Sequence, residues 1–279
     1  MLRLIALIFL YFCVSACEII NPDEEIPAYL TVLKPKLIMP NGDTSTTAVR
    51  DVWVYQTGTY IGTFETPARF PVLHLKDNSY YLFDGGIAEN TFSGSRRSYP
   101  FWMLDTFKTK MESNKDYTFQ PTFKYYSDSL LKFRVKEDFE QLGTQFEYCG
   151  SEVYDTARIT KINEIGNTIG AVFFDKDSME FCAGSINPFI FPRGKSDLFA
   201  EITYRSSVYF FVGIIINNSA QPIIQLKPTS DWKTEYINLA FLANSAAENA
   251  QLRLLLRSIQ TQKGGYIYLD NIRFIHLNI

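Results

Sequence analysis

The sequence is poor in the residues and motifs that most often carry catalysis. Among 279 residues it has only two histidines, His74 and His276, and four cysteines. No Gly-x-Ser-x-Gly, His-Glu-x-x-His or Cys-x-x-Cys pattern occurs. The segment Gly194-Lys195-Ser196 lacks the earlier glycine of a phosphate-binding loop, because Phe189 stands in its place. These absences exclude the common hydrolase, zinc-protease, thiol-redox and nucleotide-binding motifs, so we expect no enzyme.

The chain also lacks an excess of positive charge. It carries 27 Lys and Arg against 30 Asp and Glu, a formal net charge of -3. A nucleic-acid-binding surface needs a concentrated positive field, and this composition does not supply one. We therefore exclude a nucleic-acid partner.

The amino end has a long apolar run that is still too short to cross a bilayer. Leu4 to Val14 is apolar throughout and follows the single charge of Arg3. About eleven residues is the length of a signal-peptide core, whereas a membrane span needs about twenty. The run ends at Val14-Ser15-Ala16-Cys17, which resembles the lipobox of bacterial lipoproteins.

The resemblance implies that residues 1–16 are removed and that Cys17 is acylated, with palmitate-type chains that anchor the protein without spanning the membrane. An ordinary signal peptide cut after Ala16 remains the alternative. Residues 17–27 are acidic and read as a tether. They resemble the surface-export signal of Bacteroidetes lipoproteins, which implies an outer-membrane, cell-surface location; a plain solvated linker is the alternative.

Aromatic residues make up 15% of the chain, and Phe and Tyr dominate them. Such residues favour the half-buried surfaces of β-sheets. From Ala28 onward, short apolar runs alternate with turn signals every eight to twelve residues, a spacing typical of sandwiches and barrels. The sequence therefore predicts an all-β fold. The stretch Ala240 to Gln251 looks helical but lacks an apolar stripe, so we expect a loop with at most one helical turn there.

Residues 28–126 form the first predicted domain. Val52-Trp53-Val54-Tyr55 and Tyr60-Ile61-Gly62-Thr63 read as a hairpin that turns at Gln56-Thr57-Gly58 and is followed by Thr66-Pro67. These sequence segments resemble PEGA-type and other immunoglobulin-like surface repeats. The resemblance implies an immunoglobulin-like sandwich that serves as a stalk or adhesive support.

Residues 127–279 form the second predicted domain. Leu198 to Tyr204 alternates apolar residues on one face, and Val208 to Ile216 reads as a central strand with both faces covered. With Asp138-Phe139-Glu140 near the start and Tyr268-Leu269-Asp270-Asn271-Ile272 near the end, this half resembles jelly-roll carbohydrate-binding modules and galactose-binding-like domains.

That resemblance implies two kinds of site. A structural calcium commonly lies where the first and last strands meet, and Glu140 and Asp270 stand at the matching positions with hard oxygen donors. The alternative is that Glu140 is merely exposed and Asp270 accepts backbone hydrogen bonds. Sugar recognition needs aromatic platforms and convergent polar groups. The expected ligand residues are Tyr209, Phe211 and Tyr236 on one sheet face, with Asn217 and Asn238 nearby; Trp232 is assigned to core or strand-edge packing.

Cys149 and Cys182 are the thiols that remain after the signal peptide and the lipidated cysteine are set aside. An oxidising compartment permits a disulfide between them. The closed loop of about 33 residues would contribute roughly 3 to 4 kcal/mol. Two separate buried thiols are the alternative, because spacing alone does not bring their Cα atoms together.

Two functions follow from these patterns. The first is non-catalytic glycan binding by the C-terminal jelly roll of a lipid-anchored surface protein. The second is a structural or adhesive lipoprotein that binds a protein partner and recognises no carbohydrate. Fold alone does not decide between them.

Overall fold

A computed structural model describes residues 26–40, 42, 44–45, 48–73, 80–150, 156–175, 179–192, 194, 197–260 and 264–278. The all-β prediction is confirmed, with several sheets and one short helix, α3 (Ala240–Ser245), in the part described. This single short helix agrees with the expectation for Ala240 to Gln251. Cys17, His74, the signal peptide and all of the tether except Ile26 and Pro27 lie outside the described residues. No helix in the described ranges is long and apolar enough to cross a membrane.

In the N-terminal region, residues 28–126, the described residues form eleven strands in three sheets. Two small sheets have the orders β10-β1-β6 and β11-β2-β3, and a larger one has the order β5-β4-β7-β8 with β9 also on β7. The strands are β1 (Ala28–Val32), β2 (Lys36–Ile38), β3 (Thr44–Ser45), β4 (Asp51–Gln56), β5 (Thr59–Glu65), β6 (Ala68–Val72), β7 (Tyr80–Ala88), β8 (Arg96–Ser98), β9 (Asp105–Lys108), β10 (Asp116–Phe119) and β11 (Thr122–Lys124).

The predicted hairpin of the N-terminal region is formed by β4 and β5. Thr57 has φ 48° and Gly58 has φ 85°, so both turn residues occupy the left-handed region that a tight two-residue hairpin requires. Val52 and Val54 point into the core, which leaves Trp53 and Tyr55 on the other face. The immunoglobulin-like assignment of this region remains a prediction.

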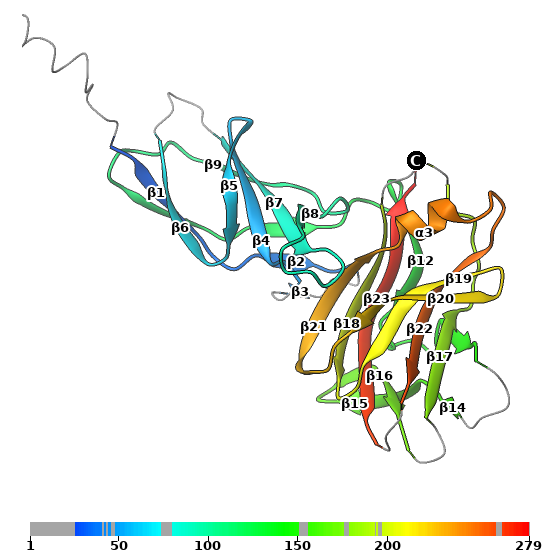
Figure 1. Cartoon of the computed structure of the whole chain (residues 1–279). Coiled ribbons are helices and arrows are strands. Elements are labelled where there is room, and N and C mark those ends of the chain that lie inside the picture. The colour runs from blue at the N-terminus through cyan, green and yellow to red at the C-terminus, as the bar shows by residue number, and fades with distance from the viewer. Residues whose placement is uncertain are drawn as a thin grey trace, which may run out of the picture.

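The described part of the C-terminal region, residues 127–279, is a β-sandwich of two six-stranded sheets (Figure 1). Sheet I has the order β15-β16-β23-β18-β21, with β12 also paired to β23; sheet II has the order β13-β17-β22-β19-β20, with β14 also paired to β17. The strands are β12 (Leu131–Glu137), β13 (Phe146–Tyr148), β14 (Thr156–Ala157), β15 (Thr160–Glu164), β16 (Asn167–Phe173), β17 (Glu180–Ser185), β18 (Leu198–Ser206), β19 (Phe210–Ile216), β20 (Ser219–Leu226), β21 (Thr229–Asn238), β22 (Leu252–Ile259) and β23 (Tyr266–Leu277).

The core of the sandwich follows the apolar alternation of its strands. Leu198, Ala200, Ile202 and Tyr204 of β18 all lie in the core, as the sequence predicts. β19 lies between β22 and β20 and is buried along most of its length, so its central position is confirmed. Each face of the sandwich therefore consists of the alternate side chains that point away from this core.

The N-terminal region packs against the outer face of sheet I. Phe199 and Ile275 of sheet I belong to the hydrophobic core of the N-terminal region. Figure 1 shows this region above and beside β21 and β18, while the opposite ends of these strands extend beyond it. One part of the outer face of sheet I is thus covered, and the other part is open.

Candidate functional site: an aromatic strip and an interdomain pocket

The open part of sheet I carries a row of aromatic side chains around one arginine. Tyr268 lies between the core residues Ile267 and Leu269, so its ring points outward. Phe173, the last residue of β16, lies in the same way between the core residues Val172 and Phe174. We call this set the aromatic strip, and it consists of Phe173 of β16, Tyr266 and Tyr268 of β23, Arg205 of β18 and Trp232 of β21.

Rings on both sides hold Arg205 in place. Its guanidinium carbon lies 4.9 Å from the Tyr268 ring centroid and 5.4 Å from that of Trp232. One guanidinium nitrogen donates to Glu164 of β15 at 2.5 Å. Its Nε is buried and has no hydrogen-bond partner among the described residues. The guanidinium is therefore a flat, fixed donor set into a row of rings.

The strip continues across β23 to β16. The rings of Tyr266 and Tyr268 stack with centroids 4.5 Å apart, and Phe173 meets Tyr268 edge-on at 6.0 Å. Phe173 is half exposed, and the other rings are partly exposed. Because the four aromatic residues come from β16, β23 and β21, the strip runs across the strands and not along them.

A pocket of about 490 Å³ lies beside the strip, between sheet I and the N-terminal region. We call it the interdomain pocket. Its lining is rich in hydroxyl, amide and carboxylate groups and consists of Met39, Thr44, Ser45, Asp138, Glu140, Asn167, Thr203, Thr234, Asp270 and Asn271. A cavity of this volume with convergent polar groups is suited to a small polar ligand.

A β-bulge shapes the floor of this pocket. The register between β18 and β23 shifts between Glu201 and Thr203, and Asn271 of β23 has φ 48°. The extra residue places Asp270 and Arg273, three positions apart, on the same outer face. Burial raises the pKa of the Asp270 carboxyl to about 6; the hydrogen bond from Asn167 opposes the rise and the nearby Asp138 adds to it.

The predicted calcium residues Glu140 and Asp270 both line the interdomain pocket. Asp270 accepts hydrogen bonds on both oxygens, from Asn167 at 3.0 Å and from the Asn271 backbone at 2.7 Å. The exposed Glu140 accepts from the backbone of Thr168 at 2.7 Å. The described residues contain no group of three or more His, Cys, Asp or Glu side chains placed to hold a metal ion. In this structure both carboxylates have hydrogen-bonding roles, and a structural calcium at this position stays a prediction.

A buried carboxylate joins the two regions next to this pocket. Glu201 of β18 has no exposed surface, and it accepts hydrogen bonds from Tyr99 at 2.5 Å and from Tyr125 at 2.6 Å. Arg273 forms an ion pair with it at 3.3 Å. Burial and the Glu201 carboxylate raise the pKa of both tyrosine hydroxyls well above their ordinary value, so they remain donors.

The expected ligand residues do not share one face. Tyr209, Phe211 and Asn217 belong to sheet II or its loops, whereas Tyr236 and Asn238 are on β21 of sheet I. The prediction of a single face is therefore wrong, because β19 and β21 pair with different partners.

Tyr236 is removed from any ligand-facing surface, because it is only 3% exposed and packs in the core of the N-terminal region. Asn238 contacts that region as well, donating to Glu89 at 2.8 Å. These two residues therefore form part of the interface between the regions.

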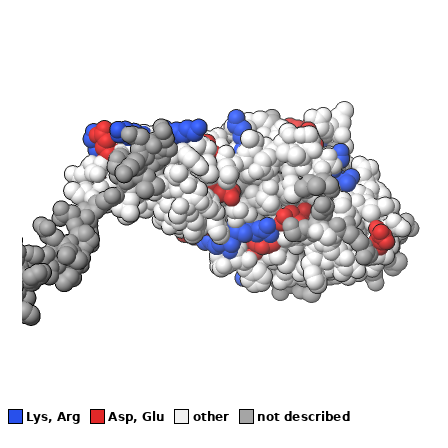
Figure 2. Space-filling view, turned by 90° about the horizontal axis from the view of Figure 1, so that it is seen from above, with Lys and Arg blue, Asp and Glu red and all other residues white. Residues whose placement is uncertain are grey.

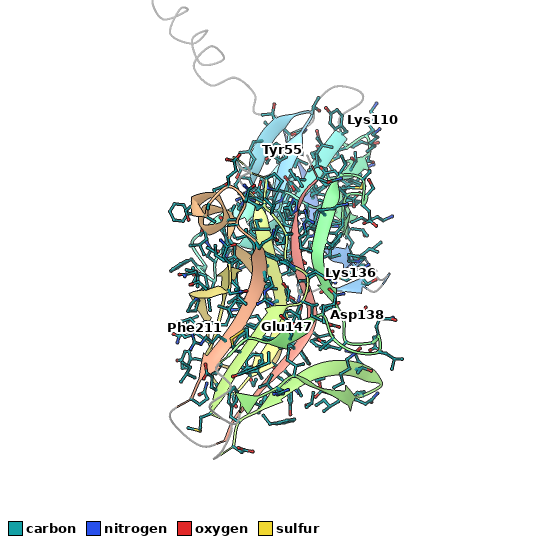
Figure 3. The ribbon with its side chains drawn as sticks, turned by 90° about the vertical axis from the view of Figure 1, so that its right-hand side faces the viewer. Tyr55, Lys110, Lys136, Asp138, Glu147 and Phe211 are labelled. Carbon is teal, nitrogen blue, oxygen red and sulfur yellow. A yellow bond between two sulfur atoms is a disulfide. The ribbon has the colours of Figure 1, made fainter. Side chains whose placement is uncertain are left out.

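The remaining three residues spread along sheet II. Tyr209 is 51% exposed, and Phe211 lies on the same face two residues later. Asn217 is six residues beyond Phe211, roughly 20 Å along the strand, where it lines a separate pocket with Glu147 and Arg253. Figure 3 shows Phe211 and Glu147 lying apart on this side of the molecule. This face has no second ring pair comparable to Tyr266 and Tyr268 among the aromatic contacts of the described residues.

The outward orientation of two residues of the aromatic strip can be predicted from the sequence. Tyr266-Ile267-Tyr268-Leu269 alternates, which predicts two outward tyrosines once Ile267 and Leu269 are assigned to the core. Trp232 lies on the edge strand β21, as expected for strand-edge packing, but its half-buried ring also borders the open face. No sequence signal places Arg205 between Trp232 and Tyr268, because that depends on long-range strand pairing.

Other predicted features have plain structural roles. A disulfide joins Cys149 to Cys182, whose Cα atoms are 5.2 Å apart. His276 is buried, its Nε2 accepts from Arg134 at 3.0 Å, and burial lowers its pKa. Figure 2 shows basic and acidic groups near one another on the face seen from above, without a continuous patch of one sign.

No protein-family model and no curated protein matches the sequence. Among solved structures, the chain is similar to the family 11 carbohydrate-binding module of a cellulosomal cellulase of Clostridium thermocellum, with 13% identity and a TM-score of 0.37 over 51% of this chain and 94% of that chain. A family 29 module complexed with mannohexaose matches with 6% identity and a TM-score of 0.35, over 53% of this chain and 92% of that one.

A third match, to carbohydrate-binding modules of the β-sandwich superfamily, has 14% identity and a TM-score of 0.37, and covers 90% of this chain and 99% of that chain. At TM-scores this low, the likeness carries no inference about the ligand. The function proposed below therefore depends on the side chains of the site.

Proposed function

We propose that this chain is a non-catalytic glycan-binding protein, and that the aromatic strip is its binding surface. The observation that carries the proposal is the placement of Arg205 between Tyr268 and Trp232 on the open part of sheet I. Sugar rings have apolar faces that pack on aromatic rings and hydroxyl edges that need fixed hydrogen-bond groups. The strip offers both in one row.

The direction of the strip supports an extended ligand. Its residues come from β21, β18, β23 and β16, which are consecutive neighbours in sheet I. Adjacent strands lie roughly 4.8 Å apart, so these four strands span roughly 15 Å. That length suits several linked sugars better than a single one. The proposed ligand is therefore an oligosaccharide or a segment of a polysaccharide.

The location of the protein is part of the same proposal. We place it on the outer face of an outer membrane, held by lipid on Cys17, because the lipobox-like segment and the acidic residues after it support such an address. Metabolic labelling with a clickable palmitate tests the anchor. The label is expected on the wild type and absent from Cys17→Ala; an equal label on both proteins would contradict it.

A glycan array followed by affinity measurements on substituted proteins tests the binding surface. For the full chain in mild detergent, Trp232→Ala and Tyr268→Ala are each expected to weaken glycan binding at least tenfold, equivalent to about 1.4 kcal/mol. Tyr209→Ala is the matched control, because Tyr209 is an exposed aromatic residue on the opposite sheet. Melting temperatures of the three variants establish that each protein is folded.

The outcomes separate the alternatives. Loss of binding in Tyr209→Ala, with binding retained in Trp232→Ala, would move the ligand to sheet II. Absence of binding to any glycan on the array would reject carbohydrate recognition and leave the C-terminal region as a scaffold for a protein partner.

A further inference from the structure

The interdomain pocket runs parallel to the aromatic strip, one row of side chains away. On β18, Thr203 precedes Arg205 by two residues, and on β21, Thr234 follows Trp232 by two. Asp270 follows Tyr268 by two residues on β23. Two residues along a strand correspond to roughly 7 Å and return to the same face. The floor of the pocket is therefore the next row of the same sheet surface.

The interdomain pocket lies on the side of the aromatic strip where the strands of sheet I continue toward the N-terminal region. β18 ends at Ser206 and β23 begins at Tyr266, so sheet I stops just beyond the strip on the other side. On the side toward the N-terminal region, the next row of outward side chains consists of Thr203, Thr234 and Asp270. Thr44 of the N-terminal region lines the opposite wall of the pocket. A group that projects sideways from a chain on the strip would enter this walled space.

The chemistry of the lining suits a hydroxylated group. Thr203 and Thr234 share a hydrogen bond of 3.0 Å at the floor, and Asn167 donates to Asp270 at 3.0 Å on the far side. Hydroxyls, amides and carboxylates of this kind exchange hydrogen bonds with sugar hydroxyls. The volume of about 490 Å³ falls within the roughly 300–1,000 Å³ of small-molecule sites.

We infer that the interdomain pocket holds a single-sugar branch of a glycan whose main chain lies across the aromatic strip. The protein then selects branched chains over linear chains of the same backbone. This inference rests on the proposed function, since it needs a main chain on the strip. It also makes the N-terminal region part of the binding site, because Met39, Thr44 and Ser45 form one wall.

The buried contact at Glu201 explains how a pocket between two regions keeps its shape. Glu201 is on the same strand and the same outer face as Thr203, and it fixes Tyr99 and Tyr125 of the N-terminal region. With its carboxylate fully buried, the wall and the floor of the pocket are held together by interactions that solvent does not reach. Glu201 is therefore a positioning residue for this pocket.

Matched pairs of oligosaccharides test the inference with the full chain in detergent. The pairs are linear and galactosyl-branched mannan, linear and xylosyl-branched glucan, and linear and arabinosyl-branched xylan. We expect the branched member of the bound pair to bind at least tenfold more tightly. Thr44→Trp, which fills the pocket from the exposed side, is expected to reduce the affinity for the branched member to that for the linear one.

A control and a second variant keep the result interpretable. Thr59→Trp places the same bulk at an exposed threonine of β5 that does not line the pocket, and it is expected to keep the preference for branches. Thr203→Val retains the shape of the floor and removes one hydroxyl, so a severalfold loss is expected for the branched member alone.

Three outcomes overturn the inference in different ways. Equal binding of linear and branched members, with binding still lost in Trp232→Ala, rejects the branch pocket and leaves the proposed function intact. A preference for branches that survives Thr44→Trp places the branch elsewhere and also rejects it. Absence of binding to all pairs, together with a negative glycan array, rejects both the inference and the proposed function.

Discussion

Tyr99 of the N-terminal region donates a 2.5 Å hydrogen bond to Glu201 of the C-terminal region, although 102 positions separate the two residues in the sequence. The contact is fully buried and includes Arg273, which is 3% exposed. A stalk that merely carried a second domain would not need such a contact. The two regions are instead joined through a shared polar core.

We expect Glu201→Ala to destabilise the protein by about 3–5 kcal/mol, because it leaves Arg273 as a buried charge without its partner. Urea unfolding followed by tryptophan fluorescence measures the loss. Glu147→Ala is the control, because the Glu147 side chain is 51% exposed and water can replace it beside Arg253, so its removal is expected to cost less than about 1 kcal/mol. Equal midpoints for the two variants would contradict a structural role for Glu201.

The disulfide gives a second prediction. Replacing Cys149 and Cys182 together by Ser is expected to lower the free energy of unfolding by about 3–4 kcal/mol, since the bond closes a loop of 33 residues in the unfolded chain. Chemical unfolding of the variant and of the wild type, with and without reductant, measures the difference. A wild type whose stability does not respond to reductant would show that the bond contributes nothing.

Asp270 makes stability depend on pH in a defined direction. Burial raises the pKa of its carboxyl from 3.8 to about 6, so the folded protein holds a proton that the unfolded chain has already lost between these values. The stabilising contribution is complete below pH 3.8 and disappears as the pH rises through 6. The expected loss between pH 4 and pH 7 is about 2–3 kcal/mol.

Asp270→Asn removes this titration and keeps the shape of the side chain, so its stability should fall less over the same range. The difference between wild type and variant is the quantity to measure, by urea unfolding at several pH values. Burial also raises the pKa of the Asp84 carboxyl to about 6. Asp84 is present in both proteins, so its contribution to the pH dependence cancels in that difference. Parallel curves for the two proteins would mean that Asp270 titrates normally.

Gly170 gives a packing prediction. A Cβ atom added there would lie 2.5 Å from the Phe139 ring, which is fully buried. Gly170→Ala is therefore expected to cost about 1–3 kcal/mol through overpacking. Gly94→Ala is the matched control, because an added Cβ meets nothing within 4 Å there. Similar melting temperatures for the two variants would show that the Phe139 ring can move aside.

The sequence was most informative where a pattern is local. The alternation of Leu198, Ala200, Ile202 and Tyr204 predicted the core face of β18, because a strand repeats every two residues whatever its neighbours are. The turn at Thr57 and Gly58 was readable for the same reason, since two residues suffice to define a tight hairpin.

The candidate site was harder to predict because it depends on distant pairings. The sequence pattern predicts Tyr209 and Tyr236 on one face, yet Tyr209 precedes β19 in sheet II and Tyr236 is on β21 in sheet I. Arg205 meets Trp232 and Tyr268 because β18 pairs with both β21 and β23. Apolar periodicity says which side chains point outward, but it does not say which strands become neighbours.

The two faces of strand β18 limit which mutations this protein can accept. One side of its nine residues fills the sandwich core, and the other side supplies Glu201 to the joint between the regions and Arg205 to the aromatic strip. Inserting or deleting one residue would turn the charged positions inward and the apolar positions outward. The sandwich core, the Glu201 contact between the regions and the aromatic strip would then be lost together, so a change in the length of this strand is expected to be more damaging than any single substitution in it.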